Sequence, residues 1–460
     1  MNRRDFLAAA AGTYLSALSA RAQDGLTQDT EKPDFTVRIG PVDLEIAPHR
    51  VFKTIGYNGS VPGPPLRMTE GQPVTIDVLN ETSTPELVHW HGLFIPSEVD
   101  GSAEEGTPPV PPKGRQRYRF TPRPSGTRWY HSHTYAGRNL HRGGYTGQFG
   151  FILIAPKQDP ARYDQEVLLA LHGWDPYFTT MGDEGSLEVG YNFHSVNSHA
   201  LGSGEPVRVR EGQRVLFRIL NASATDAHRL ALPGHQFTVV ALDGNAVPTP
   251  RAVEALDLAP AERIDAIVEM NHPGVWILGE ADDKMRQDGL GIVIEYANHQ
   301  GPAQWSAPGA SAWDYTMFGS GSAAAEPDRR VPLVFKPKFA GNRWVDHWTI
   351  NGKEFPKTDP IRVKPNGRYR LSFDNQSDDA HPVHLHRHYF ELVSIAGKST
   401  AGVMKDVVMC PPRKTVEVQF VADNPGPTLF HCHQQLHMDF GFMAMVEYEG
   451  YRSMAPMRHG

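Results

Sequence analysis

Alternating apolar and polar residues recur at three places along the chain, each time after a turn that contains glycine. The stretches cover residues 70–80, 211–221 and 365–375, and each closes on an asparagine. Successive side chains of a strand point to opposite faces of a sheet, so this alternation predicts strands with one buried face. The same reasoning predicts strands over 148–154, 166–171, 264–268, 291–295 and 415–420. No long segment carries a helical period, so the pattern predicts an all-β protein.

The threefold recurrence indicates three copies of one kind of domain. The closing residues Asn80, Asn221 and Asn375 are separated by stretches of domain length, about 100–150 residues. Antiparallel domains of this size with many turns are usually two-sheet sandwiches with Greek-key connections. The predicted divisions are a leader over 1–22, a first β-sandwich domain over 30–157, a second over 158–300, a linker over 301–327 and a third domain over 328–450.

Composition supports a folded protein with many loops. The chain has 460 residues, with 43 glycines and 38 prolines that show no collagen repeat, and its hydrophobic share of 40% is too high for a disordered chain. A formal net charge of -7 without a run of lysine or arginine argues against nucleic-acid binding. No stretch outside the leader reaches the roughly 18 apolar residues that a membrane span needs. The only cysteines, Cys410 and Cys432, could form at most one disulfide.

The N-terminal residues are typical of an export signal. Arg3 and Arg4 precede Phe6 and a short run rich in alanine and leucine, which ends at an A-x-A site from Ala20 to Ala22. Paired arginines before Phe-Leu resemble a twin-arginine signal, which exports proteins that have already folded. An ordinary secretory signal or a chance basic start is the alternative. We therefore expect an exported protein, periplasmic or secreted.

Histidines are paired more often than composition predicts. The chain has 22 histidines, for which chance gives roughly one His-x-His pair. On a strand, residues i and i+2 share a face, so each pair can present two imidazoles to one site. Imidazole is a good ligand for copper and zinc. Five pairs occur: His89 with His91, His131 with His133, His384 with His386, His386 with His388, and His431 with His433.

The repeats indicate where these pairs belong. His89 and His384 are each the ninth residue after the closing asparagine of their segment, where the middle segment has Leu230. Likewise, 129–133 matches 429–433, whereas the middle segment offers 275–279 without histidine. The first and third domains are therefore predicted to share one metal site, with the second domain as a spacer. The remaining histidines are expected to be surface or structural, with His388 left open: His49, His141, His172, His194, His199, His228, His235, His272, His299, His347 and His459.

Strand parity separates a second metal site from the first. Cys432 lies between His431 and His433, so its thiolate faces the other side of the predicted strand and must serve a different metal. His381 turns the same way as Cys432 by parity, and His437 lies just beyond the strand. Two imidazoles and one thiolate describe a blue-copper electron-transfer centre. Zinc is the alternative, although zinc sites usually have four ligands close together in the sequence.

Four motifs in this order resemble those of the multicopper oxidases, specifically the three-domain laccase-like members. The resemblance spans residues from about 35 to 450. It implies three cupredoxin-like Greek-key β-sandwich domains and four copper ions, of which one is type 1, one type 2 and two type 3. The motifs read His89-Trp-His91-Gly92, His131-Ser-His133, His381-Pro-Val-His384-Leu-His386 and His431-Cys-His433-Gln-Gln-Leu-His437.

The resemblance also implies a role for each motif residue. Asp100, which follows His89 by eleven residues, matches an acidic residue that helps deliver protons to oxygen. The implied copper ligands are His381, Cys432 and His437 for type 1; His89 and His384 for type 2; His91, His131 and His433 for one type 3 ion; and His133, His386 and His431 for the other.

Two positions depart from the family pattern. Arg387 stands where the family usually has glycine, so the loop near the type 1 copper is expected to be remodelled. Phe442 occupies the axial position, five residues after His437, where many bacterial members have methionine. A bulge in the strand would instead bring in Met443. Cys410 is expected to be a dispensable structural thiol.

The implied activity is laccase-like. Small reducing substrates, namely phenols and aromatic amines, would give up single electrons at the type 1 copper near His437, and oxygen would be reduced to water at the other three. A metallo-oxidase of Cu(I) or Fe(II) is the competing enzyme, and it would favour a methionine-rich or acidic cover over the type 1 site. A structural protein that has lost copper is the non-enzymatic alternative, which the intact ligand set disfavours. A monomer without nucleic-acid or membrane partners is expected.

Overall fold

The computed structural model describes residues 31–156, 162–181, 186–310, 313–339 and 345–451. The chain divides into a first unit, Met1–Asp34, and a compact unit, Phe35–Gly460. The predicted leader over 1–22 lies outside the described residues. All the strands and helices named below belong to the compact unit.

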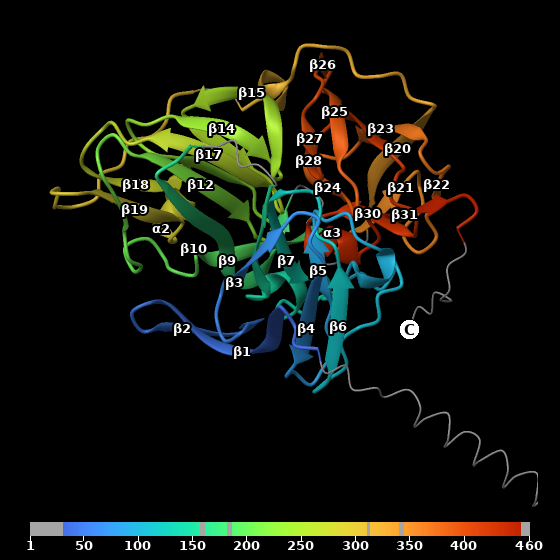
Figure 1. Cartoon of the computed structure of the whole chain (residues 1–460), viewed down its shortest axis with the longest axis horizontal. Helices are drawn as coiled ribbons and strands as arrows, with labels where there is room; N and C mark the ends of the chain where they lie inside the picture. The colour runs from blue at the N-terminus through green and yellow to red at the C-terminus, as the bar shows by residue number, and fades with distance from the viewer. Residues whose placement is uncertain (1–30, 157–161, 182–185, 311–312, 340–344, 452–460) are drawn as a thin grey trace, which may run out of the picture. The chain divides into compact units, whose positions relative to one another are not determined.

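The first β-sandwich holds two four-stranded sheets, coloured blue to teal in Figure 1. Its elements are β1 Phe35–Ala47, β2 Arg50–Tyr57, β3 Gly63–Thr69, β4 Val74–Asn80, β5 Val88–His91, the 3-10 helix η1 Ser97–Val99, β6 Arg115–Phe120, β7 Gly126–Ser132, the 3-10 helix η2 Gly143–Tyr145 and β8 Phe149–Ala155. The strand orders are β2-β1-β4-β6 and β3-β8-β7-β5. Apolar side chains from both sheets, such as Ile76 and Trp90, form one buried cluster.

The second β-sandwich has a six-stranded and a five-stranded sheet. Its elements are β9 Gln165–Met181, β10 Ser186–Val196, β11 Val207–Val209, β12 Arg214–Asn221, β13 His228–Ala231, β14 Phe237–Leu242, β15 Asn245–Val253, β16 Ala255–Leu258, β17 Arg263–Glu269, β18 Val275–Glu280, α2 Asp283–Gln287 and β19 Gly291–Tyr296. The strand orders are β10-β9-β12-β17-β14-β15 and β11-β19-β18-β13-β16.

The third β-sandwich, orange to red in Figure 1, follows the 3-10 helix η3 Tyr315–Phe318. Its elements are β20 Arg329–Lys338, β21 His347–Ile350, β22 Ile361–Val363, β23 Arg368–Asn375, β24 His381–Leu385, β25 Phe390–Ile395, β26 Lys398–Ser399, β27 Met404–Lys405, β28 Val407–Cys410, β29 Thr415–Val421, β30 Thr428–Cys432, α3 Gln435–Asp439 and β31 Met443–Tyr448. One sheet runs β21-β20-β23-β29-β25-β26, with β27 beside β25, and the other runs β22-β31-β30-β24-β28.

One pairing scheme recurs in all three sandwiches. The strands that end on the closing asparagines, β4, β12 and β23, each pair in parallel with the first long strand of their own sandwich. In the opposite sheet the last strands, β8, β19 and β31, each pair in parallel with an earlier strand of the same sandwich, namely β3, β11 and β22. The second and third sandwiches therefore match strand for strand, with β13, β16 and β18 at the places of β24, β28 and β30.

Buried hydrogen bonds explain why an asparagine recurs at the end of these three strands. Each is buried at the end of its strand and donates its side-chain amide to two backbone carbonyls of other segments, which satisfies polar groups that burial would otherwise leave unpaired. The acceptors are Thr84 and Val110 for Asn80, Asp226 and Leu258 for Asn221, and Asp379 and Cys410 for Asn375.

The structure confirms the all-β prediction, since each predicted strand overlaps an observed one. Among the described residues the α-helices α2 and α3 have five residues each. Within the same residues, no helix combines the length and apolar character needed to cross a bilayer. The domain boundaries proposed from the sequence stay predictions.

The predicted match between the middle and third segments is wrong by a small shift. His384 faces His431 across β24 and β30, whereas the corresponding pair on β13 and β18 is Ala231 with Gly279. The counterpart of His384 is therefore Ala231, not Leu230. The loop after Asn221 is one residue longer than the loop after Asn375, so counting from the asparagine misses the register.

Candidate metal centre

Four short strands bring the predicted histidine pairs together where the first and third sandwiches meet. On β5 and β7 of the first sandwich, His89 faces His131. On β24 and β30 of the third, His384 faces His431. The ring centroids of His89 and His384 lie 5.8 Å apart, so the two strand pairs face each other directly. All the histidines of this cluster are buried or nearly so.

Backbone carbonyls determine which nitrogen four of the histidines, His89, His131, His384 and His431, turn into the cluster. Nδ1 of His89 donates to the Asp100 carbonyl at 2.9 Å, and Nδ1 of His384 donates to the Asp406 carbonyl at 2.7 Å. His131 uses its Nδ1 in the same way on the next residue's carbonyl. Hydrogen bonds of this kind orient metal-binding imidazoles and leave Nε2 as the ligand atom.

The cluster fits metal ions. The Nε2 atoms of His89, His133, His384 and His433 are buried and lack hydrogen-bond partners within the described part of the chain. A buried polar atom without a partner costs about 1–3 kcal/mol, which a metal bond would remove. Ligand atoms converge to within 4.8 Å in three sets: His89, His91 and His384; His91, His131 and His433; and His133, His386 and His431.

Burial also keeps these imidazoles in the form that binds metal. It lowers the pKa of His89 to about 4 and that of His433 to about 3. For the same reason the pKa of His384 falls well below 6.5. Neutral imidazole is the ligand form, so the site does not have to release protons near neutral pH before a metal binds.

A second set of donors lies on the other face of β24 and β30. Sγ of Cys432 is 3.8 Å from Nδ1 of His381 and 3.8 Å from Nδ1 of His437, and the two nitrogens are 3.2 Å apart. The hydroxyl of Ser377 lies 2.9 Å from Nε2 of His381 and so directs its Nδ1 toward the thiol. The predicted parity therefore holds, because Cys432 faces away from the cluster that its neighbours form.

Phe442 lies beside this second set. Its ring centroid is 4.9 Å from that of His381, and its side chain is fully buried. Met443 pairs with His431 across β30 and β31. Opposite residues of an antiparallel pair share a face, so Met443 lies on the face away from Cys432. The structure thus brings Phe442, and not Met443, next to the thiol and its two histidines.

Sequence models described as multicopper oxidase match residues 40–159, 181–291 and 327–450, which together make up more than half of the chain. The chain belongs to the multicopper oxidase family. It is therefore a copper-dependent oxidoreductase that uses oxygen.

This multicopper oxidase is similar, over most of its length, to other proteins of known sequence and to proteins with solved structures. "Multicopper oxidase MmcO" of Mycobacterium tuberculosis is 29% identical over 86% of this chain and 84% of its own length. "Copper resistance protein A" of Escherichia coli is 23% identical over 90% and 92%. The structure titled "Fet3p, a Multicopper Oxidase that Functions in Iron Import" gives a TM-score of 0.77 at 21% identity over 90% of each chain. A multicopper oxidase from Pseudomonas thermotolerans gives 0.70 at 26% identity over 91% and 100%.

Asp100 lies at the cluster, as predicted, and is joined there by an acid that the sequence did not reveal. Oδ2 of Asp100 accepts from Nδ1 of His386 at 2.8 Å, and Oε2 of Glu105 lies 3.4 Å from the same nitrogen. Burial raises the pKa of Asp100 to about 7 and raises that of Glu105 well above 4.5. Both carboxyl groups are fully buried, and the charge of Asp100 acts with burial to raise the pKa of Glu105, which favours a proton on one of the two. Four loop residues separate them, without a periodic signal.

Arg387 binds the first sandwich and the loop before β30, and the remodelled loop expected near the type 1 copper stays a prediction. The Arg387 backbone φ of 58° lies in the left-handed region, where glycine is usual. Its buried guanidinium donates to Thr428 and to carbonyls from the first sandwich and from the loop before β30: Ile95, Asn424, Pro425 and Pro427. Arg387 therefore fastens two domains together beside His386. The neighbouring His388 is structural, with its Nε2 2.6 Å from the hydroxyl of Tyr448.

A buried ion pair also links all three sandwiches at the cluster. Oδ1 of Asp406 lies 3.1 Å from Nε2 of His91, which leaves Nδ1 of His91 for the cluster. Both oxygens of Asp406 accept from Arg263 of the second sandwich. The partners are far apart in sequence, so no local pattern could have indicated this contact.

Glu188, on β10 of the second sandwich, contacts His437 of the thiol site. Oε1 of Glu188 accepts from Nε2 of His437 at 3.3 Å, and the carboxylate keeps 18% of its exposure. Asp379 and Asp346 are further carboxyl groups of this region. Burial raises the pKa of Asp379, and the negative charges of Glu188 and Asp346 raise it as well. The second sandwich is therefore more than a spacer.

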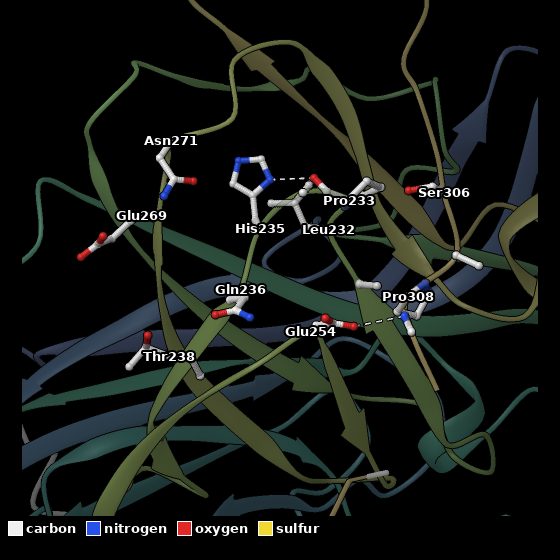
Figure 2. A pocket seen from close by; sticks show the side chains of 15 residues that line it. Leu232, Pro233, His235, Gln236, Thr238, Glu254, Glu269, Asn271, Ser306 and Pro308 are labelled. Carbon is white, nitrogen blue, oxygen red and sulfur yellow. Dashed lines mark hydrogen bonds between the residues drawn. The ribbon is translucent and has the colours of Figure 1, made fainter. Parts of the chain in front are cut away.

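Two further features lie outside both donor sets. The hollow in Figure 2, about 540 Å³, is lined by polar side chains of the second sandwich such as Gln236, Glu254 and Glu269, and by none of the predicted ligands. Cys410 is a buried free thiol whose pKa is raised by burial, as expected of a structural residue.

Proposed function

We propose that this multicopper oxidase holds four copper ions in the sites described above. The main support is the convergence of buried donor atoms, several of them without other partners. Bound copper would supply one-electron chemistry, so that four single-electron donors reduce one oxygen molecule to two waters. The proposed ligands are His381, Cys432 and His437 for type 1; His89 and His384 for type 2; His91, His131 and His433 for one type 3 ion; and His133, His386 and His431 for the other.

Cys432 connects the two sites through its own backbone. Its side chain belongs to the type 1 set, while its neighbours His431 and His433 belong to the cluster. The path between the sites is therefore a few covalent bonds long. Asp100 and Glu105 hold a proton beside His386, where a reaction that consumes protons takes place.

The reducing substrate is proposed to be a phenol or an aromatic amine that docks at the edge of His437. The half-buried carboxylate of Glu188 can accept a hydrogen bond from a hydroxyl or amino group there. Apolar side chains pack in the same region, including Leu187, Val345 and Phe440. An apolar wall with one directed acceptor is the usual composition of a small-molecule site.

A metallo-oxidase of Fe(II) or Cu(I) is the second candidate. The observation that favours it is the group of carboxylates near His437, namely Glu188, Asp346 and Asp379. Carboxylate oxygens are suitable ligands for divalent cations. Thioether ligands would favour Cu(I), and Met438 is buried within α3, one residue after His437.

Oxygen uptake distinguishes these substrates. Copper-loaded protein would be assayed with a series of phenols and aromatic amines and, separately, with Cu(I) and Fe(II). We expect the highest kcat/KM with phenols, and Glu188→Gln should raise KM several-fold with little change in kcat. Glu447→Gln, at an exposed position on β31, is the matched control. A higher kcat/KM for a metal ion that Asp379→Asn abolishes would instead establish the metallo-oxidase.

We further propose export by the twin-arginine route, which the residues over 1–22 suggest. Replacing Arg3 and Arg4 by lysine should leave the protein in the cytoplasm if that route is used. Export that persists would point to an ordinary secretory signal. A monomer in size-exclusion chromatography is expected.

A further inference from the structure

A cavity of about 580 Å³ lies between the second and third sandwiches, away from the copper sites. It is lined by residues of β16 and β28, which are edge strands of their sheets, and by residues at the start of α2 and η3. Its volume falls within the roughly 300–1,000 Å³ that small-molecule sites usually have.

The cavity occupies the place in the second sandwich that the type 1 site occupies in the third. Leu230 faces Glu280 across β13 and β18, just as Val383 faces Cys432 across β24 and β30. Glu280 therefore stands where the third sandwich has its thiol. By the same register, His228 stands at the place of His381, since each begins its strand and pairs with the edge strand beside it.

The surroundings of His228 repeat those of His381 as well. Ser223 lies 3.1 Å from Nε2 of His228, as Ser377 lies beside Nε2 of His381. Met285 is the third residue of α2, as His437 is the third residue of α3. His228, Glu280 and Met285 all line the cavity. The second sandwich thus keeps the frame of a type 1 site without its cysteine.

The polar groups at this place already satisfy one another. Oε2 of Glu280 lies 3.2 Å from Nδ1 of His228, and the carboxylate also accepts from the backbone N–H groups of Arg229 and Asp282. A ligand nitrogen without a partner, as found in the copper cluster, does not occur on His228. The observations therefore favour an organic molecule over a metal ion.

The walls indicate which kind of molecule fits. Trp313 and Tyr315 supply aromatic rings, 5.6 Å apart between centroids and nearly perpendicular. Met285 and Met409 supply thioethers, which make favourable contacts with aromatic rings. Arg229 pairs with Asp257 and Lys398 pairs with Asp314, so these charged groups around the cavity are already paired, whereas the buried Nε1 donor of Trp313 has no hydrogen-bond partner among the described residues.

We propose that this cavity binds a small planar aromatic molecule that carries a hydroxyl group, whose oxygen can accept a hydrogen bond from Nε1 of Trp313. The cavity is adjacent to the third sandwich, because β28 pairs directly with the strand that carries His381. Neighbouring strands lie about 4.8 Å apart, so the bound ring would lie within a strand or two of the type 1 ligands. Binding there requires no electron transfer, so the inference is independent of the proposed substrate.

Methyl NMR of methionine-labelled protein tests the proposal at the cavity itself. The copper-loaded protein is reduced under anaerobic conditions, so that the probe, 4-methoxyphenol, is not consumed. Met285→Leu and Met409→Leu assign the two methyl resonances of the cavity. We expect both resonances to shift saturably with one common Kd, and 4-methoxytoluene, which lacks the hydroxyl group, to bind about tenfold more weakly.

Filling the cavity is the decisive variant. Ile395→Trp adds a ring to the wall and should weaken binding by about tenfold or more, whereas Val51→Trp, at an exposed position of the first sandwich, should not. Wild-type protein in which neither Met285 nor Met409 shifts at saturating probe would overturn the proposal. So would shifts that arise with zinc ions alone and not with the phenol, because these would make the site a metal site.

Discussion

The second and third sandwiches place different residues at the same point of the same fold. In the third, Cys432 and two histidines face one another, and within the described residues these histidines are the hydrogen-bonding partners of the thiol. In the second, Glu280 stands at the place of the cysteine and is held by His228 and two backbone N–H groups. Strand pairing fixes where the side chains meet, and the side chains alone decide whether a metal can enter.

The first sandwich carries a third set of side chains at the positions equivalent to Cys432 and His381. Val88 faces Ser132 across β5 and β7, so serine takes the place of the cysteine. Glu86, two residues before Val88, takes the place of His381 and accepts from the hydroxyls of Thr84 and Thr134. Only one of the three equivalent points therefore carries the soft donor that a blue copper requires.

Cys432→Ser makes the third sandwich resemble the first, and it should have the largest effect. The intense blue absorption should disappear and oxidase activity should fall by about a thousandfold or more, equivalent to about 4 kcal/mol. The cluster histidines are untouched, so metal analysis should still find three coppers. Cys410→Ala is the matched control and should keep both colour and copper. Blue colour that survives in Cys432→Ser would refute the type 1 assignment.

Asp100→Asn tests the contrast between two buried carboxyl groups, Asp100 of the first sandwich and Glu280 of the second. Glu280 is tied to backbone groups, whereas burial raises the pKa of Asp100 to about 7 and so favours a proton on that carboxyl group beside His386. If that proton is delivered to oxygen, the variant should slow reoxidation of the reduced enzyme by about a hundredfold. Anaerobic bleaching of the blue band by substrate should stay fast. Equal slowing of both half-reactions would make Asp100 merely structural.

The same variant has a pH signature. Burial raises the pKa of Asp100 to about 7, so the acid form that can donate prevails below that pH and is lost as pH rises through it. Positive copper ions nearby would lower this pKa, so the fall in wild-type reoxidation is expected at or below pH 7. Asparagine does not titrate, and Asp100→Asn should lose this limb of the profile.

Glu280→Ala should cost stability without costing copper. The change leaves His228 and the backbone N–H groups of Arg229 and Asp282 without their acceptor, so the free energy of unfolding should fall by about 2 kcal/mol in urea titrations. Glu205→Ala, at an exposed ion pair, should change it by about 0.5 kcal/mol or less. Loss of a copper ion in Glu280→Ala would show that the second sandwich binds metal after all.

Local patterns were enough to predict the strands and the opposing directions of Cys432 and His431, because both follow from the two-residue period of a strand. They were not enough to align the second sandwich, where one extra loop residue after Asn221 displaces the register. Glu188, Glu105 and the Asp406–Arg263 pair were missed because each meets its partner from a distant segment, and a charged residue in a loop carries no period.

Phe442→Met should have the smallest effect. It tests how far the reduction potential of the proposed type 1 copper depends on the side chain beside it. The buried ring packs against His381 and offers no lone pair, so it would not supply an axial ligand to a bound copper. A thioether there would stabilise the oxidised copper and lower the reduction potential, by about 60 mV for a tenfold change in a one-electron equilibrium. Met443→Leu should change the potential little, since Met443 pairs with His431 and turns to the opposite face. A redox titration of both variants measures this directly. The reverse order of effects would mean that Met443 reaches the copper in solution, and it would shift the expected substrates toward the more easily oxidised metal ions.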